Sequence, residues 1–123
     1  VRGACMLPAQ RQGFTDNIRV RSIIGRFLEH SRVFYFAWGK DEELLLSSAD
    51  WMSRNMVRRV ELAWPVLDKK LRQRVIDECL VAYLGDDRDA WTLEASGAYQ
   101  KPKRPVDGSG AQQALVERYG RGR

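Results

Sequence analysis

The chain has 123 residues, 44% of them hydrophobic and 30% charged, and carries a net charge of +5. This length predicts one domain with a core, and no apolar run approaches the roughly 20 residues that a membrane-spanning helix needs. Arginine outnumbers lysine. Because the guanidinium group binds anions through two donors at once, the composition favours polyanionic ligands: nucleotide, polyphosphate or nucleic acid.

The cysteines and the chain start give further expectations. Cys5 and Cys79 lack CxxC spacing, and with His30 as the single histidine they offer no zinc-binding set. We expect two buried, reduced thiols, as in a cytosolic protein. No charged-then-apolar leader is recognisable, so we expect no signal peptide, and the start at Val1 without methionine suggests a piece of a longer protein.

The first part of the chain is predicted to mix strands with one helix. In order, we expect a strand over Val1–Leu7 ended by Pro8, a polar loop over Ala9–Asn17, a strand over Ile18–Arg21, a helix over Ser22–Glu29 and a hairpin over Val33–Ser48. The helix depends on Ser22 as an N-cap and on apolar residues at helical spacing after it. The hairpin strands, Val33–Trp38 and Leu44–Leu46, would be joined through the turn Gly39-Lys40-Asp41.

The second part repeats this alternation. In order, we expect a short helix or turn over Ala49–Met56, a strand over Val57–Trp64 ended by Pro65, a long helix over Asp68–Leu84, a strand over Ala90–Tyr99 and a terminal helix over Ser109–Tyr119. One apolar stripe on the long helix is predicted to pack in the core: Leu71, Val75, Ile76, Cys79, Leu80 and Tyr83.

The interleaved elements predict an α/β fold, a mixed β-sheet flanked by helices. We divide the chain into a domain core over 1–99, a basic Pro/Gly linker over 100–110, and a terminal helix with a frayed tail over 111–123.

His30 allows two interpretations from the local pattern. It could close the predicted helix, where the C-terminal end of the helix dipole favours its charge. It could instead be a catalytic or phosphate-contacting imidazole, because arginines surround it in sequence: Arg19, Arg21, Arg26 and Arg32. Alternation over 18–21 would put Arg19 and Arg21 on one strand face, although a solvated basic face gives the same pattern.

Three longer stretches carry a family resemblance: Asn17–Arg32, Ser47–Met52 and Arg58–Glu61. Together with the opening Val1–Cys5, they resemble the C-terminal catalytic domain of bacterial polyphosphate kinases of the histidine-phosphorylating type. The resemblance runs from Val1 to about Tyr99. It implies a phospholipase D-like fold and a four-domain enzyme that passes the ATP γ-phosphoryl group through a phosphohistidine in a preceding domain to polyphosphate.

The resemblance also implies residue roles. Arg2 and His30 match family positions that face the ATP phosphates, so His30 is the candidate catalytic residue and Arg2 a substrate contact. Arg19, Arg21, Arg32 and Asp50 are candidate supporting residues. Asp50 would orient His30 or a nearby arginine, or else cap the helix over Ala49–Met56.

Two other functions remain open at this stage. A phospholipase D-like phosphodiesterase or nuclease needs His-x-Lys-x4-Asp, but Arg32 replaces the lysine and Ala37 the aspartate, and Ser47–Asp50 matches Gly-Ser-x-Asn only loosely. A non-enzymatic nucleic-acid module could stack bases on the aromatic residues of 33–38.

The resemblance finally implies surroundings. ATP, ADP and polyphosphate would be substrates, Mg²⁺ would bind in the absent domains with no metal ligand here, and no nucleic acid is expected. The full-length protein would be a cytoplasmic homo-oligomer that can associate with the membrane periphery, and the isolated fragment would be inactive.

Overall fold

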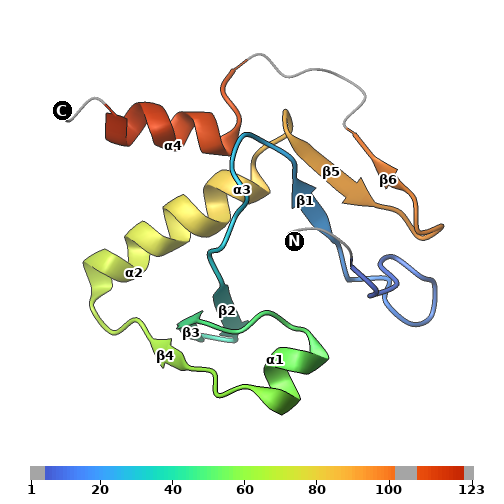
Figure 1. The fold of residues 1–123 in the computed structure, drawn as a ribbon, viewed down its shortest axis with the longest axis horizontal. Coiled ribbons are helices and arrows are strands. Elements are labelled where there is room, and N and C mark those ends of the chain that lie inside the picture. Colours follow the sequence, from blue (N-terminus) through green and yellow to red (C-terminus); the bar gives the residue numbers. More distant parts are fainter. Residues whose placement is uncertain (1–4, 102–107, 121–123) are drawn as a thin grey trace. The chain divides into compact units, whose positions relative to one another are not determined.

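The structure, a computed structural model, describes residues 5–101 and 108–120 and divides into two compact units (Figure 1). Unit 1 combines Val1–Glu29 with Ala82–Arg123, and unit 2 is His30–Val81. Each unit contains strands and helices, so the predicted α/β class is confirmed. The strands form two three-stranded sheets, and every pairing among the described residues is antiparallel, where one mixed sheet was expected.

The sheet of unit 1 has the order β1-β5-β6, from β1 (Arg21–Ile23), β5 (Ala90–Leu93) and β6 (Tyr99–Gln100) (Figure 1). The predicted strand over 18–21 is therefore shifted towards the C-terminus, although Val20 and Ser22 are both buried, as an alternating stretch requires. The core beside this sheet is formed by Ala9, Val20 and Leu93, with Cys5, Ile18 and Tyr99 packed against it.

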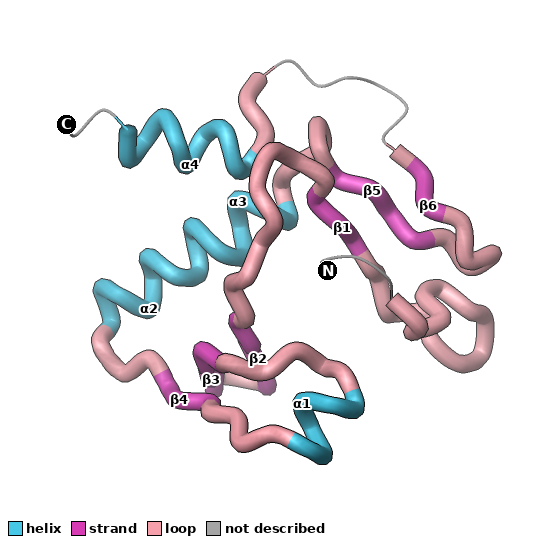
Figure 2. The backbone as a smooth tube through the Cα atoms, in the orientation of Figure 1, coloured by secondary structure: helices cyan, strands magenta, loops and turns pink. Residues whose placement is uncertain are grey.

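The predicted helix over Ser22–Glu29 is wrong. Ser22 and Ile23 belong to β1, opposite Trp91 and Ala90, and residues 24–29 are irregular, with bends at 25–27, and are drawn as a loop in Figure 2. Ser22 is 3% exposed and caps nothing. Strand pairing and hydrogen bonds to a distant glutamine, described below, override the helical spacing of the apolar residues.

The other predictions in unit 1 have mixed outcomes. The described part of the expected first strand, Cys5–Leu7, is not a strand, and residues 1–4 lie outside the described residues. The strand expected over 90–99 is a hairpin, because the chain turns between β5 and β6. The terminal helix is confirmed as α4 (Ala111–Gly120), whereas most of the expected linker, 102–107, and the tail, 121–123, lie outside the described residues.

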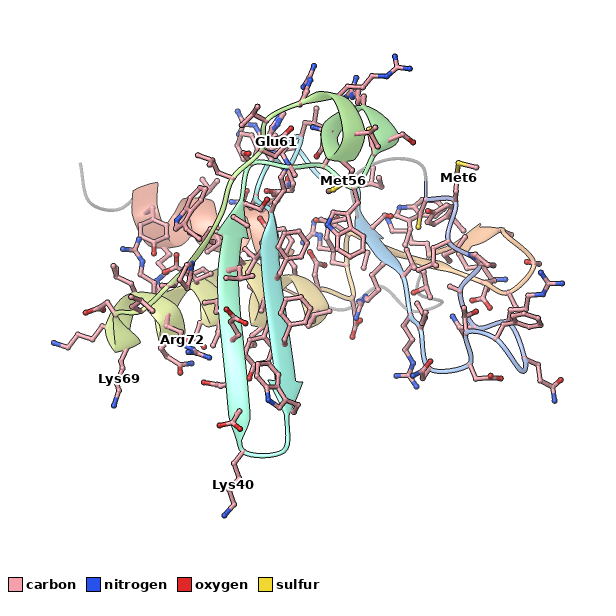
Figure 3. All side chains as sticks on the ribbon, turned by 90° about the horizontal axis from the view of Figure 1, so that it is seen from below. Met6, Lys40, Met56, Glu61, Lys69 and Arg72 are labelled. Atoms are coloured by element: carbon pink, nitrogen blue, oxygen red, sulfur yellow. The ribbon has the colours of Figure 1, made fainter. Side chains whose placement is uncertain are left out.

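The sheet of unit 2 has the order β2-β3-β4, from β2 (Val33–Trp38), β3 (Asp41–Ser47) and β4 (Ala63–Pro65). The predicted hairpin is confirmed, and Figure 3 shows Lys40 at its turn. Gly39 has φ +63°, a conformation that glycine adopts without steric cost. Leu44, 1% exposed, is the largest fully buried side chain among the described residues.

The helices of unit 2 differ from the predictions in two ways: α1 begins later than expected, and the long helix contains a π-helical stretch. α1 (Ser53–Arg58) takes the place of the helix expected over 49–56, and the strand expected over 57–64 shrinks to β4, which includes Pro65. The long helix is confirmed: Asp68 Oδ1 accepts the Leu71 N–H at 2.8 Å, opening α2 (Lys69–Val75). It continues as the π-helix η1 (Ile76–Val81) and, in unit 1, α3 (Ala82–Leu84).

The expected core stripe of this helix is only half-buried. Val75, Ile76, Cys79 and Leu80 are partly covered, and Leu71 remains 54% exposed. Cys5 and Cys79 are likewise half-buried and form no disulfide, so the expectation of fully buried thiols is wrong.

Candidate functional site

His30 is the first residue of unit 2 and lies between the irregular segment 24–29 and strand β2. Its side chain is exposed, and its carbonyl oxygen accepts a hydrogen bond from Arg32 Nη1 at 3.0 Å. Residues 24–29, which directly precede His30, form no helix, so the interpretation as a helix-closing histidine is wrong. The imidazole therefore lies at the end of an irregular segment, and Arg32 binds the backbone of this segment at His30.

Arg32 connects His30 to Asp50. Its Nε lies 2.8 Å from Asp50 Oδ1, and the two side chains are 24% and 23% exposed. The hydrogen bond to Asp50 raises the pKa of Arg32 above its ordinary value, so the guanidinium stays charged. Asp50 does not cap α1, whose N-cap is Met52 without a side-chain bond. Asp50 thus pairs with a neighbouring arginine, and its part in orienting the site stays a prediction.

A second set of polar contacts fixes the segment that carries Asp50. The Glu61 carboxylate accepts hydrogen bonds from Ser48 Oγ and from Asn55 Nδ2, the latter at 2.7 Å. These bonds, that of Ser48 first, lower the pKa of Glu61. Ser48 and Leu62 also exchange two bonds of 3.0 Å, one of them from the Leu62 N–H to Ser48 Oγ. Residues 47–50 are thus tied to residues 61–62.

Sequence reasoning missed Asn55 and gave Glu61 no role. Asn55 is 4% exposed although it lies in a short, basic helix. Glu61 ends one of the family-like stretches, Arg58–Glu61, and that was the signal that could have identified it. Asn55 had no comparable signal, because its burial depends on how the chain returns from α1 to β4.

The remaining predicted arginines belong to unit 1. Arg21 donates hydrogen bonds to the carbonyl oxygens of Leu84 and Asp86 and pairs with Asp87 Oδ1 at 2.8 Å, so it ties β1 to the end of the long helix. Arg19 is exposed. Arg2 lies outside the described residues. The structure therefore connects Arg32 with Asp50 and with the His30 carbonyl oxygen in unit 2, whereas the contacts of Arg21 lie within unit 1.

Over residues 5–101 and 108–120, no three His, Cys, Asp or Glu side chains gather into a group that could hold a metal ion. None of the helices in this part of the chain is long and apolar enough to span a bilayer.

Comparisons with known proteins agree with one another. The family described as polyphosphate kinase C-terminal domain 2 matches residues 1–113. The polyphosphate kinase of Paraburkholderia phytofirmans is 47% identical over 119 residues, which cover 97% of this chain and 17% of that protein. The polyphosphate kinase of Xylella fastidiosa is 49% identical over 119 residues, covering 95% of this chain and 17% of its own length.

A solved structure gives the same result. The crystal structure of polyphosphate kinase from Porphyromonas gingivalis is similar with a TM-score of 0.70 and 40% sequence identity, over 88% of this chain and 16% of that chain. The chain thus spans about a sixth of the length of these relatives.

Proposed function

The chain belongs to the polyphosphate kinase family, as its C-terminal domain 2, and we propose that it supplies phosphate contacts to the transfer of the ATP γ-phosphoryl group to polyphosphate. The transfer is reversible and passes through a phosphohistidine in a preceding domain, which supplies the nucleophile. The phospholipase D-like fold implied by the resemblance is part of this proposal. The observation that carries it is the exposed His30 beside the Arg32–Asp50 pair, inside family-like stretches.

Each candidate residue has a role in the proposal. Phosphoryl transfer depends mostly on positioning and charge stabilisation. Arg2 gives a fixed positive charge to the phosphate oxygens, and protonated His30 stabilises developing charge or donates a proton. Arg32 pairs with Asp50 and orients His30 by donating a hydrogen bond to the His30 carbonyl oxygen. Arg19 adds positive charge, and Arg21 supports β1.

The surroundings are part of the same proposal, in which this chain is one domain of a protein as long as its relatives. ATP, ADP and polyphosphate are the substrates, and the Mg²⁺ ligands and the phosphorylated histidine are in the remainder of the polypeptide. We place the full-length protein in the cytoplasm as a homo-oligomer with peripheral membrane association. Residues 1–99 form its domain core, 100–110 a linker and 111–123 a terminal helix and tail.

The two rival functions fit less well. A phosphodiesterase of the phospholipase D type needs a carboxylate where Ala37 stands, in β2 opposite Glu42. A nucleic-acid module would use the aromatic residues of β2, but β3 begins with Asp41-Glu42-Glu43 beside them, and the Tyr35 hydroxyl donates to the Glu42 carboxylate. Acidic side chains next to stacking groups repel phosphate, so this surface is a poor binder of nucleic acid.

The test uses the full-length kinase with Arg2→Ala and His30→Ala. Each substitution should cost on the order of 2–4 kcal/mol of transition-state stabilisation, the usual size for one preorganised donor. Arginine stays charged at any working pH, so Arg2→Ala should leave the shape of the pH–rate profile unchanged. His30 must be protonated to act as an acid, so His30→Ala should also remove the alkaline limb.

The same proposal can fail in two ways. Near-wild-type turnover of His30→Gln with an intact alkaline limb would remove His30 from the site. Incubating the isolated fragment with labelled ATP and Mg²⁺ should give neither polyphosphate nor an acid-labile phosphoprotein, and stable labelling of His30 would overturn the division of roles between domains.

A further inference from the structure

Gln112, in the first turn of α4, binds a backbone segment far from it in sequence. It is 5% exposed. Its Oε1 accepts the Phe27 N–H at 2.8 Å, and its Nε2 donates to the Phe27 carbonyl oxygen at 2.7 Å. One side-chain amide thus satisfies both backbone polar groups of Phe27, as a neighbouring strand would.

The same amide reaches the residue before His30. Gln112 Nε2 also lies 2.7 Å from Glu29 Oε1, which accepts the Tyr83 hydroxyl at 2.6 Å. We call Gln112, Phe27, Glu29 and Tyr83 the Gln112 clamp. All four residues belong to unit 1, and the peptide bond after Glu29 leads directly into His30.

Two further contacts fit the segment and the helix to the clamp. A Cβ added at Gly25 would lie 2.4 Å from Gln112 Oε1, so only glycine allows the segment to approach the amide this closely. The Ala111 N–H donates to Asp86 Oδ2 at 2.7 Å, which anchors the first turn of α4. The family match ends at residue 113 and includes this turn.

We propose that Gln112 is a positioning residue of the phosphoryl-transfer site, which holds residues 25–29 so that the chain enters His30 in one conformation. This role rests on the proposed function of His30. Residues 25–29 belong to no helix or strand, so the side-chain hydrogen bonds of the clamp help to hold this irregular segment in place before substrate binds. Misplacement of a catalytic group by about 1 Å can reduce the rate on the order of 100-fold.

The test compares Gln112→Met with Gln113→Met in the full-length kinase. Methionine has a similar size but makes none of the three hydrogen bonds. The neighbouring Gln113 is exposed and binds Glu117 at 2.9 Å within α4, so it controls for the change of residue type. We expect kcat to fall on the order of 10-fold in Gln112→Met, with the KM for ATP within about 2-fold, and no change in Gln113→Met.

A double substitution separates positioning from stability. If Gln112 acts through His30, adding Gln112→Met to His30→Ala should lower kcat no further than His30→Ala does alone. A fully additive 10-fold loss, or a wild-type kcat in Gln112→Met, would overturn the inference. His30→Ala at the wild-type rate would overturn the proposed function, and this role with it, before any Gln112 variant is compared.

A milder variant covers the case in which Gln112→Met does not fold. Tyr83→Phe removes one hydrogen bond to Glu29 and leaves Gln112 in place. Tyr83→Phe should lower kcat on the order of 3-fold in the kinase that keeps His30, and not at all in the kinase that carries His30→Ala. Equal loss in both enzymes would contradict the clamp.

Discussion

The two units are built by different means. Unit 2 is formed mainly by neighbours in sequence, since β2 and β3 are joined by the Gly39-Lys40 turn and β4 returns after α1. Unit 1 joins two distant segments, and Gln112 binds Phe27 across 85 positions of sequence. Local patterns can therefore specify unit 2, whereas unit 1 depends on side chains that meet only after folding.

Both units contain buried and exposed polar contacts. In unit 1, Asp86 and Gln112 are each 5% exposed and bind backbone groups. In unit 2, Asn55 is 4% exposed, whereas the Arg72–Glu42 pair of 2.9 Å has a Glu42 side chain that is 45% exposed; Figure 3 labels Arg72 on α2. Buried polar groups are costly to leave unpaired, whereas exposed pairs contribute little, so burial should decide how much a substitution costs within each unit.

The largest expected effect concerns Asp86→Ala in unit 1. Asp86 Oδ1 accepts the N–H groups of Arg88 and Asp89 at 2.9 and 2.8 Å, and Oδ2 accepts that of Ala111. Removing the carboxylate leaves three N–H groups without their partner, so the free energy of unfolding should fall by about 3 kcal/mol. Urea denaturation of the 123-residue domain measures this loss.

Asp87→Ala is the matched control for Asp86→Ala. The Asp87 side chain is 58% exposed and pairs with Arg21 at the surface. Its removal should cost less than about 1 kcal/mol. Equal losses in the two variants would mean that the buried carboxylate is no more important than the exposed one, and burial would then not decide the cost of a substitution.

The predictions from sequence succeeded where an element depends on nearby residues and failed where it depends on distant ones. The hairpin over 33–48 was predicted because its aromatic and β-branched strands flank a turn with glycine, and the long helix because Asp68 precedes an amphipathic stretch. The helix over 22–29 failed because its partners, Trp91 and Gln112, lie more than sixty positions away. A helical spacing of apolar residues does not reveal such tertiary bonds.

Candidate site residues came from the stretches that carry a family motif, and their roles stay predictions. His30, Arg32 and Asp50 came from the family-like stretches, and the structure brings them together. Gln112 and Asn55 were not predicted, because buried amides have the same sequence signal as exposed ones. Arg21 was grouped with the anion-binding arginines, but its bonds to carbonyl oxygens depend on where residues 84–86 lie after folding.

A smaller effect is expected from Gly39→Ala in unit 2. Gly39 has φ +63°, and an added Cβ would meet nothing within 4 Å. The cost is therefore that of the left-handed backbone alone, about 1 kcal/mol, measured by urea denaturation. Asparagine tolerates this conformation better, so Gly39→Asn should cost less. A loss of about 3 kcal/mol would show that the hairpin turn is as critical as the buried contacts of unit 1.

A pH-dependent effect is expected from Glu61→Gln. Hydrogen bonds from Ser48 and Asn55 lower the pKa of Glu61 from its ordinary value of 4.5. The folded state thus binds this proton less tightly than the unfolded state. The resulting stability is present above pH 4.5 and is lost as pH falls through the lowered pKa. Melting temperatures between pH 3 and pH 6 should fall less steeply in Glu61→Gln.

Glu43→Gln removes the same charge from an exposed position of β3 and controls for the change in net charge. An identical flattening of the acid limb in both variants would show that overall charge, and not the Ser48–Asn55–Glu61 contacts, sets the acid stability of unit 2.

The smallest effect is expected from Ser22→Ala, with a sign opposite to that predicted from sequence. As the N-cap of a helix, Ser22 would contribute about 1 kcal/mol. In the structure it is 3% exposed in β1, and its hydroxyl has no hydrogen-bond partner among the described residues. Replacing a buried, unsatisfied hydroxyl by a methyl group removes a desolvation cost, so Ser22→Ala should leave the free energy of unfolding unchanged or raise it by up to about 1 kcal/mol. Ser31→Ala, at an exposed position, should stay within about 0.5 kcal/mol of the parent domain. A loss of 1 kcal/mol or more in Ser22→Ala alone would mean that its hydroxyl makes a stabilising bond, and β1 would then join Asp86 and Gln112 among the polar contacts that hold unit 1 together.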